Sequence, residues 1–186
     1  LMAYGIDKIG RREYVINVKN LETGEIYNDK IPNTEGDPVW ANDNQTIFYT
    51  SKNQVTLLSE KIKRHKLGTD AGTDKTVYTE TDPSNYIGVG KTKSDKFILI
   101  TSQQTLSSEV RWVDANKPEG TFTVFQPRMK EVLYSVDHAV DKFYIRTNLA
   151  AKNFKVMTSA ENKTDSSAWQ ELISHDDKVL IQGFDL

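Results

Sequence analysis

The sequence predicts an all-β fold, in the form of a partial β-propeller with about three and a half to four four-stranded blades. Two observations carry this prediction. Val, Ile, Thr, Tyr and Phe cluster in short runs between segments rich in Gly, Asp, Asn, Ser, Pro and Lys, which is typical of strands and turns. A group of four such runs also recurs about every 45 to 50 residues, which is the length of one propeller blade.

Three strongly apolar runs mark the repeat. They are residues 46–50, 96–101 and 142–147, and their apolar cores begin at Ile47, Phe97 and Phe143, which are 50 and 46 residues apart. An interior strand of a blade is covered on both faces by neighbouring blades, so it must be apolar on both faces. We therefore assign each run as the second strand of a blade.

The other strands follow in order around these runs. First strands are expected at residues 39–40, 86–89 and 134–136, third strands at 61–67, 109–113 and 154–157, and fourth strands at 76–79, 121–125 and 169–173. Residues 1–5, 14–19 and 25–27 supply the second to fourth strands of an earlier blade, and residues 179–184 begin a later one. We therefore treat 1–186 as a single partial propeller domain with blade boundaries near residues 36, 84, 132 and 178.

The composition disfavours several classes of protein. There are 24 Lys and Arg residues against 26 Asp and Glu, giving a formal charge of −2, whereas nucleic-acid and anionic-membrane surfaces need a clustered positive excess. The absence of Cys excludes a disulfide scaffold, a thiolate zinc site and a Cys nucleophile. No apolar run approaches the roughly 20 residues that span a bilayer. We expect no nucleic acid and no membrane among its partners.

No segment carries a recognisable catalytic or cofactor motif. There is no Gly-x-Ser-x-Gly sequence, and Gly88-Val-Gly90 lacks the strand-to-helix context of a phosphate-binding loop. The three His residues share no metal-ligand spacing. We therefore expect no catalytic residue, no metal and no cofactor in this chain.

Asp137, His138 and Asp141 form a local group of histidine and carboxylates, and a second group, His175-Asp176-Asp177, falls in an expected connection between blades, where polar turn residues are common. A carboxylate-held histidine is a possible general base. The first group falls between a first and a second strand, however, where Asp side chains commonly accept hydrogen bonds from turn amides. We favour the turn, because a hydrolase built on Asp137 and His138 has no identifiable nucleophile or oxyanion donor.

Two further sets of residues are assigned structural roles. Lys61, Lys63 and His65 alternate with Arg64 and Lys66 along one expected strand, so no face collects all the charge and a solvated outer strand is favoured over a phosphate-binding stripe. The three tryptophans, at positions 40, 112 and 169, are expected to fill the wedges between blades rather than to stack on a ligand.

Specific residues go beyond this general pattern. Residues 39–58, VWANDNQTIFYTSKNQVTLL, followed by residues 64–69, resemble the propeller of the oligopeptidase B (protease II) group in the prolyl oligopeptidase family of serine peptidases. Further similar segments are residues 20–24, 108–115, 134–138, 143–148, 152–154 and 169–172. The resemblance runs in order over nearly the whole chain.

The resemblance implies a seven-bladed propeller that covers an α/β-hydrolase domain, whose Ser, Asp and His triad cleaves short peptides after Arg or Lys. In such enzymes the propeller acts as a lid and a size filter, which excludes water and limits access. The triad has no counterpart here, so this chain is expected to be inactive alone. The implied partners are the parent hydrolase domain, the remaining blades and, through the parent, short basic peptides; family analogy also favours the cytoplasm.

The residues near the expected inner strands are candidates for lining the central channel or meeting the hydrolase domain. They are Glu35, Asp37, Trp40, Asp137, His138 and Arg146. Because an exposed ion pair contributes only about 0 to 1 kcal/mol, several charges would have to act together to hold a closed state.

An open arc of blades would expose apolar faces at both ends. We therefore expect the isolated chain to associate with itself or with the rest of its parent. The alternative function is an independent propeller scaffold that binds proteins through its rim or top face.

Overall fold

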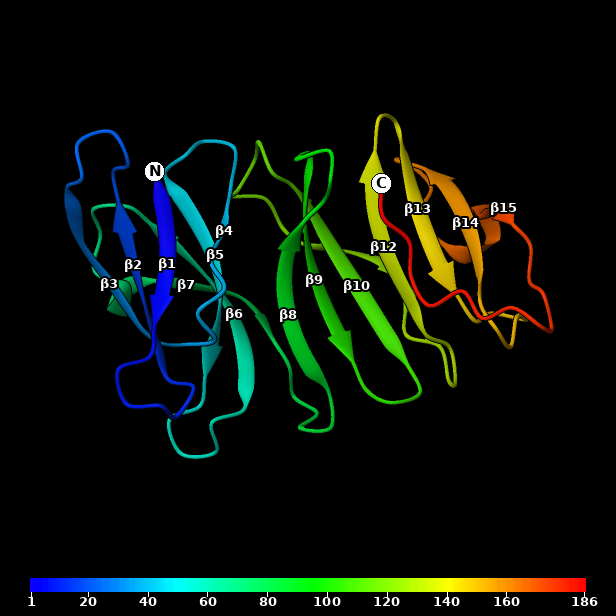
Figure 1. Cartoon of the computed structure of the whole chain (residues 1–186), viewed down its shortest axis with the longest axis horizontal. Helices are drawn as coiled ribbons and strands as arrows, with labels where there is room; N and C mark the ends of the chain where they lie inside the picture. The colour runs from blue at the N-terminus through cyan, green and yellow to red at the C-terminus, as the bar shows by residue number, and fades with distance from the viewer.

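The computed structural model describes residues 1–186 and is built of antiparallel strands with two single-turn 3₁₀ helices (Figure 1). The strands of the first half are β1 (Met2–Ile6), β2 (Tyr14–Lys19), β3 (Ile26–Thr34), β4 (Val39–Trp40), β5 (Thr46–Lys52), β6 (Ser59–Lys66) and β7 (Lys75–Thr79). Those of the second half are β8 (Tyr86–Lys91), β9 (Phe97–Gln103), β10 (Ser108–Asp114), β11 (Thr123–Gln126), β12 (Tyr134–Ala139), β13 (Lys142–Thr147), β14 (Lys155–Ala160) and β15 (Gln170–Ile173). The helices are η1 (Ala71–Thr73) and η2 (Ser166–Ala168).

The strands pair in simple succession and form sheets that stand side by side along the molecule (Figure 1). The second half contains two four-stranded sheets, β8-β9-β10-β11 and β12-β13-β14-β15. In the first half β4 pairs with β5, and β3 joins β5 only through the pair Thr34 and Ser51. Apart from that pair, the first half divides into β1-β2-β3 and β4-β5-β6-β7. The all-β fold predicted from the sequence is confirmed.

Both faces of the β8–β11 sheet are buried against neighbouring sheets. Ile98 and Ile100 on one face join a cluster with Phe48 and Ile62 of the β4–β7 sheet. Phe97 and Leu99, which alternate with them along β9, join a second cluster that includes Phe143 of the β12–β15 sheet. The second strands are apolar on both faces for this reason, as the sequence pattern predicted.

The end of the chain differs from the expectation of a further strand at residues 179–184. Beyond β15 the structure contains only an isolated bridge between Asp176 and Val179. A strand requires a ladder partner, and the backbone of Ile181 is bonded elsewhere: its N–H donates to the Asn153 carbonyl, and its own carbonyl accepts from Arg146. Residues 176–181 therefore bond to the loop before β14 instead of starting a sheet. None of the helices has the length and apolar character to cross a bilayer.

Candidate functional site

The six candidate residues do not form one site, because the fold places them at different ends of the sheets. Glu35 and Asp37 precede β4, whereas Asp137 and His138 lie in the second half of β12. β8 and β12 run in the same direction (Figure 1). Asn42, in the turn after β4, donates to the carbonyl of Asp95, in the turn after β8, so the ends of these strands lie together. Glu35 and Asp37 therefore belong to the opposite end from His138.

Glu35 has an internal partner. Its carboxylate accepts a hydrogen bond from the Ser59 hydroxyl and lies 3.1 Å from Nζ of Lys52. The Lys52 side chain is only 4% exposed, and its Nζ also donates to the Arg12 carbonyl at 2.6 Å. Because a buried ammonium needs a counter-charge, Glu35 stabilises the fold.

Asp37 and Trp40 lie on either side of the start of β4. Asp37 is exposed and makes no ion pair or side-chain hydrogen bond, and Trp40 is half-buried opposite Ile47. Asp37 is therefore the candidate whose carboxylate is exposed and has no ionic partner within this chain.

Asp137 accepts hydrogen bonds from two backbone amides, Lys93 N–H at 2.8 Å and His138 N–H at 2.7 Å. The first of these bonds crosses from the β12–β15 sheet to the turn between β8 and β9. Asp137 thus joins two neighbouring sheets through a turn, which is the role favoured from the sequence.

His138 lies fully buried between the same two sheets. Its Nδ1 is 2.8 Å from the Ser94 hydroxyl and its Nε2 is 2.9 Å from a Glu161 oxygen, which Lys96 also contacts at 2.5 Å. Burial lowers the pKa of His138 and outweighs the opposing effect of Glu161, which favours the neutral imidazole. A serine, a histidine and a glutamate in a row have the composition of a hydrolytic triad, but a fully buried ring with both nitrogens bonded cannot take a proton from a bound substrate.

The sequence predicted wrongly that His65 lies on a solvated outer strand. The side chain is fully buried, with Nδ1 2.8 Å from Asp74 and Nε2 3.0 Å from Asp29. Tyr49 donates its hydroxyl proton to the second oxygen of Asp74 at 2.8 Å. Burial lowers the pKa of His65, but the bonds to Asp74 and Asp29 outweigh it and the pKa lies above the usual value. The partners are 9 and 36 residues away in the chain, so no local motif could reveal them.

Arg64, the neighbour of His65, is also less solvated than the sequence suggested. Its side chain is 9% exposed, donates to the Pro118 carbonyl at 2.6 Å and pairs with Glu119. These contacts join β6 to the loop before β11 in the next sheet.

Arg146 is tied to the last segment of the chain. Its Nε donates to the Ile181 carbonyl at 2.7 Å, and its guanidinium lies 3.5 Å from the centre of the Phe154 ring. Burial lowers the pKa of Arg146. A planar guanidinium can combine a hydrogen bond with stacking in this way, whereas an ammonium cannot.

Replacing Arg146 with Ala is expected to release residues 176–186. The change removes a hydrogen bond from a charged donor and a cation–π contact, so amide exchange at Ile181 should be at least about tenfold faster by mass spectrometry. Arg11→Ala is the matched control, because that side chain is 67% exposed and should leave Ile181 unchanged. Equal exchange at Ile181 in wild type and Arg146→Ala would contradict this role.

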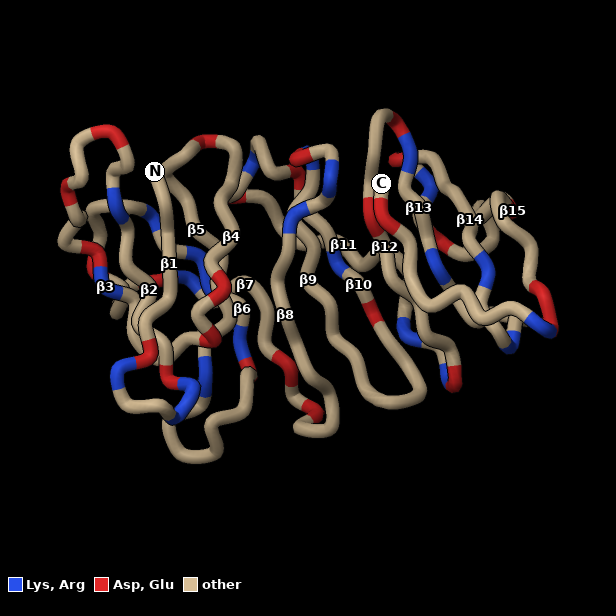
Figure 2. Tube along the Cα trace, in the orientation of Figure 1, with Lys and Arg blue, Asp and Glu red and all other residues tan.

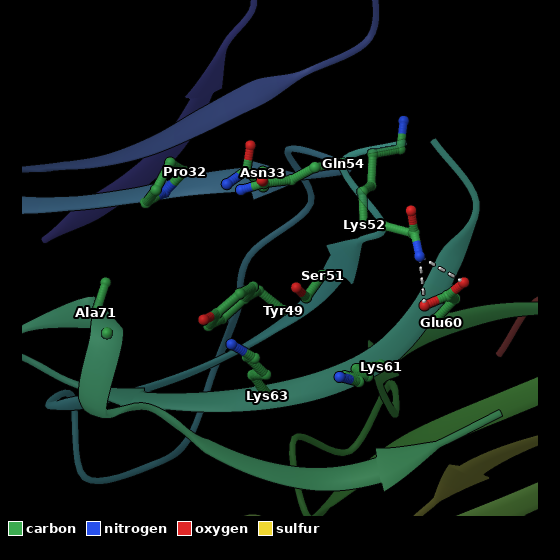
Figure 3. A pocket seen from close by; sticks show the side chains of 12 residues that line it. Pro32, Asn33, Tyr49, Ser51, Lys52, Gln54, Glu60, Lys61, Lys63 and Ala71 are labelled. Atoms are coloured by element: carbon green, nitrogen blue, oxygen red, sulfur yellow. Dashed lines mark hydrogen bonds between the residues drawn. The ribbon is translucent and has the colours of Figure 1, made fainter. Parts of the chain in front are cut away.

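A polar cavity of about 370 Å³ separates the first two groups of strands (Figure 3). Tyr49 and Ser51 of β5, and Lys61 and Lys63 of β6, form one side. The remaining lining residues are Pro32, Asn33, Lys52, Asn53, Gln54, Glu60, Ala71 and Gly72. Elsewhere acidic and basic positions are interspersed along the trace (Figure 2), and no three His, Asp or Glu side chains are grouped so that they could hold a metal ion.

Antiparallel sheets set side by side, with apolar clusters between them and hydrogen bonds linking their turns, define a segment of a β-propeller. Within that class the chain belongs to the prolyl oligopeptidase family, because the family's N-terminal β-propeller domain matches residues 1–186.

Named relatives support this assignment. The chain is 45% identical to dipeptidyl aminopeptidase BI of Pseudoxanthomonas mexicana, over 100% of this chain and 26% of that protein. It is 30% identical to Protease 2 of Moraxella lacunata, over 98% of this chain and 28% of that protein. The chain therefore spans about a quarter of the length of these curated relatives.

Solved structures agree with the sequence relatives. Oligopeptidase B from Leishmania major matches with a TM-score of 0.86 at 29% identity, covering 94% of this chain and 24% of that one. Oligopeptidase B from Trypanosoma brucei, in a closed form with covalently bound antipain, matches with a TM-score of 0.83 at 30% identity, covering 95% and 24%. The resemblance to this family predicted from the sequence is confirmed.

Proposed function

We propose that the chain is part of a propeller that covers the catalytic domain of a serine peptidase and limits which peptides reach it. The observation that carries the proposal is the match of residues 1–186 to the family's N-terminal propeller, at about a quarter of the length of the relatives. The T. brucei relative is described in a closed form, which supports a lid that moves. The partners we propose are the remaining blades and the hydrolase domain.

The packing of the sheets suits a wall that filters by size. A filter must hold its shape, and sheets buried on both faces resist deformation because their interiors are close-packed. The turns add polar contacts between sheets, including Lys93 with Asp137 and Asn42 with Asp95. The role of the chain is therefore steric, and the reacting groups lie in the rest of the peptidase.

We consider two substrate preferences for the full-length protein. The first, implied by the resemblance to the oligopeptidase B group, is cleavage of short peptides after Arg or Lys. The higher identity to a protein named dipeptidyl aminopeptidase favours a second candidate, release of dipeptides from free amino ends.

The test uses the full-length protein and peptide substrates of increasing length. We expect hydrolysis of short peptides and loss of activity on long or folded ones, and no turnover by residues 1–186 alone. Matched arylamides with a blocked arginyl group or a free dipeptidyl group separate the two preferences. Equal rates on short peptides and folded proteins would contradict the size filter, and turnover by residues 1–186 would contradict a non-catalytic role.

Charge reversal at Asp37 tests whether this end of the propeller meets the hydrolase domain. Asp37→Lys in the full-length protein is expected to change the ratio of rates on a long and a short substrate by a few-fold, because one exposed pair contributes only about 0 to 1 kcal/mol. Asp37 is preferred to Glu35, whose reversal would leave Lys52 buried without its counter-charge.

Glu22→Lys is the matched control for Asp37→Lys. Glu22 is also exposed, but it lies in the turn between β2 and β3, away from the first strands. An unchanged ratio of rates in both variants would remove Asp37 from the interface.

A further inference from the structure

We propose that the cavity between β3 and the β5–β6 hairpin binds a phosphate group, either as a free ion or as part of a small phosphorylated molecule. Figure 3 shows Lys61 and Lys63 on the β6 side of this cavity and Pro32 and Asn33 on β3 across from them. Its volume of about 370 Å³ lies within the range of small-molecule sites, about 300 to 1,000 Å³. The proposal does not depend on the peptidase function.

The cavity exists because the apolar packing is thin at this position. The two other contacts between sheets are filled by clusters of nine buried apolar residues each. The cluster next to the cavity has three, Ile16, Ile31 and Tyr49. In addition, the β1–β3 and β4–β7 groups of strands are joined by only one residue pair of a strand ladder, Thr34 with Ser51. Polar side chains therefore line a space that aromatic side chains fill elsewhere in the molecule.

The strand register gathers positive charge on one wall. Lys61 pairs with Ser51 and Lys63 with Tyr49 across the β5–β6 ladder. Because side chains at alternate positions of a strand share a face, Lys61 and Lys63 lie on the same face as Ser51 and Tyr49. The same alternation sends Arg64 to the other side, where it meets Pro118 and Glu119.

Positive charge exceeds negative charge at this cavity, and neither Lys61 nor Lys63 has a direct ionic partner. The third lysine at the cavity, Lys52, is neutralised by Glu35. Glu60 also lines the cavity and accepts hydrogen bonds from the amide of Asn53, at 3.1 and 3.2 Å. That amide is neutral, so Glu60 keeps its negative charge and offsets part of the charge of the two lysines. Lys61 and Lys63 form no ion pair and no side-chain hydrogen bond.

An oxyanion with two or more acceptor oxygens matches this arrangement. A lysine binds phosphate as a point charge, and two ammonium groups on one face leave an excess of positive charge that suits an anion even with Glu60 in the lining. The Ser51 hydroxyl and the amides of Asn33 and Gln54 line the same cavity and are neutral donors. An anion held there would connect β3 with β6 and stabilise the junction between the two sheets.

The experiment measures phosphate binding to the full-length protein by calorimetry, at constant ionic strength and with chloride as the replaced anion. Inorganic phosphate, pyrophosphate and glycerol phosphate are the probes. Wild type should bind at least one of them saturably, and Lys61→Thr/Lys63→Thr should weaken that binding by about tenfold or more. Preference for inorganic phosphate indicates a free ion, and preference for either of the others indicates a larger phosphorylated ligand.

Two variants keep this test decisive. Lys66→Thr removes a lysine from the same strand that does not line the cavity, and it should bind within about twofold of wild type. Lys63→Arg keeps the charge and should retain binding even if Lys63→Thr folds poorly. Absence of saturable binding in wild type, or equal affinity in wild type and the double variant, would overturn the proposal.

Discussion

Replacing His65 with Leu is expected to lower the free energy of unfolding by about 3 to 5 kcal/mol, because it leaves two carboxylates without the cation they share. Asp29 and Asp74 have side chains that are 7% and 1% exposed, and each lies within 3.0 Å of the ring. Chemical denaturation of both proteins near pH 6 measures the difference.

His175→Leu is the matched control for this change. The His175 side chain is 23% exposed, and its nearest carboxylate, Asp177, is 3.8 Å away. Substitutions outside buried networks usually change stability by about 0.5 kcal/mol or less. A loss below about 1 kcal/mol in His65→Leu would contradict a stabilising ion network at this position.

The pH dependence distinguishes an ion network from packing alone. The pKa of His65 is raised in the folded state, so its contribution is fully present below the unfolded value of about 6.5 and is lost as pH rises through the folded pKa. Burial acts to raise the pKa of Asp29, but its hydrogen bonds from His65 and Gly68 outweigh this and lower it. The contribution of Asp29 is therefore present above about pH 3.9 and is lost as pH falls through its folded pKa.

The difference between wild type and His65→Leu should consequently be largest between about pH 4 and pH 6.5 and should shrink in alkali. The contribution of His138 to stability depends on pH in the opposite direction. Its pKa is lowered, so the stability it contributes is present above about pH 6.5 and is lost as pH falls through the folded pKa. A difference between wild type and His65→Leu that did not change with pH would contradict the ionic account.

The sequence predicted the strands well because their pattern is physically required. Phe97 to Ile100 must be apolar on both faces, since each face meets a different sheet. The alternation that separated Lys61 and Lys63 from Arg64 is also observed. The expected strand at 179–184 was wrong, because a β-strand depends on a partner ladder that a single segment cannot reveal.

Side-chain roles were harder to predict than strands. Whether a polar residue is solvated depends on partners that are remote in the chain. The ring of His65 is buried and hydrogen-bonded to Asp29 and Asp74, and the carboxylate of Glu35 forms an ion pair with Lys52. The cavity beside Lys61 likewise depends on how closely β3 approaches the β5–β6 hairpin, which strand periodicity does not specify.

Replacing Phe143 with Ala is expected to lower the free energy of unfolding by about 3 to 5 kcal/mol, the usual range for a buried aromatic in a core. The ring is fully buried, and its centroid lies 5.0 Å from that of Phe97, 4.9 Å from Phe125 and 4.9 Å from His138. Phe97 and Phe125 belong to the β8–β11 sheet, so the deletion leaves a cavity where two sheets meet.

Tyr144→Ala is the matched control, because Tyr144 is the next residue of β13, faces the other side of its sheet and is only half-buried. Tyr144→Ala should lower the free energy of unfolding clearly less than Phe143→Ala does. Denaturant unfolding monitored by tryptophan fluorescence measures both losses, because Trp169 belongs to the cluster that contains Phe143 and Trp112 packs against it. Equal losses would mean that the contact between the two sheets does not stabilise the segment. The size filter that we propose depends on this contact, so Phe143→Ala should also admit longer peptides in the full-length protein before it unfolds.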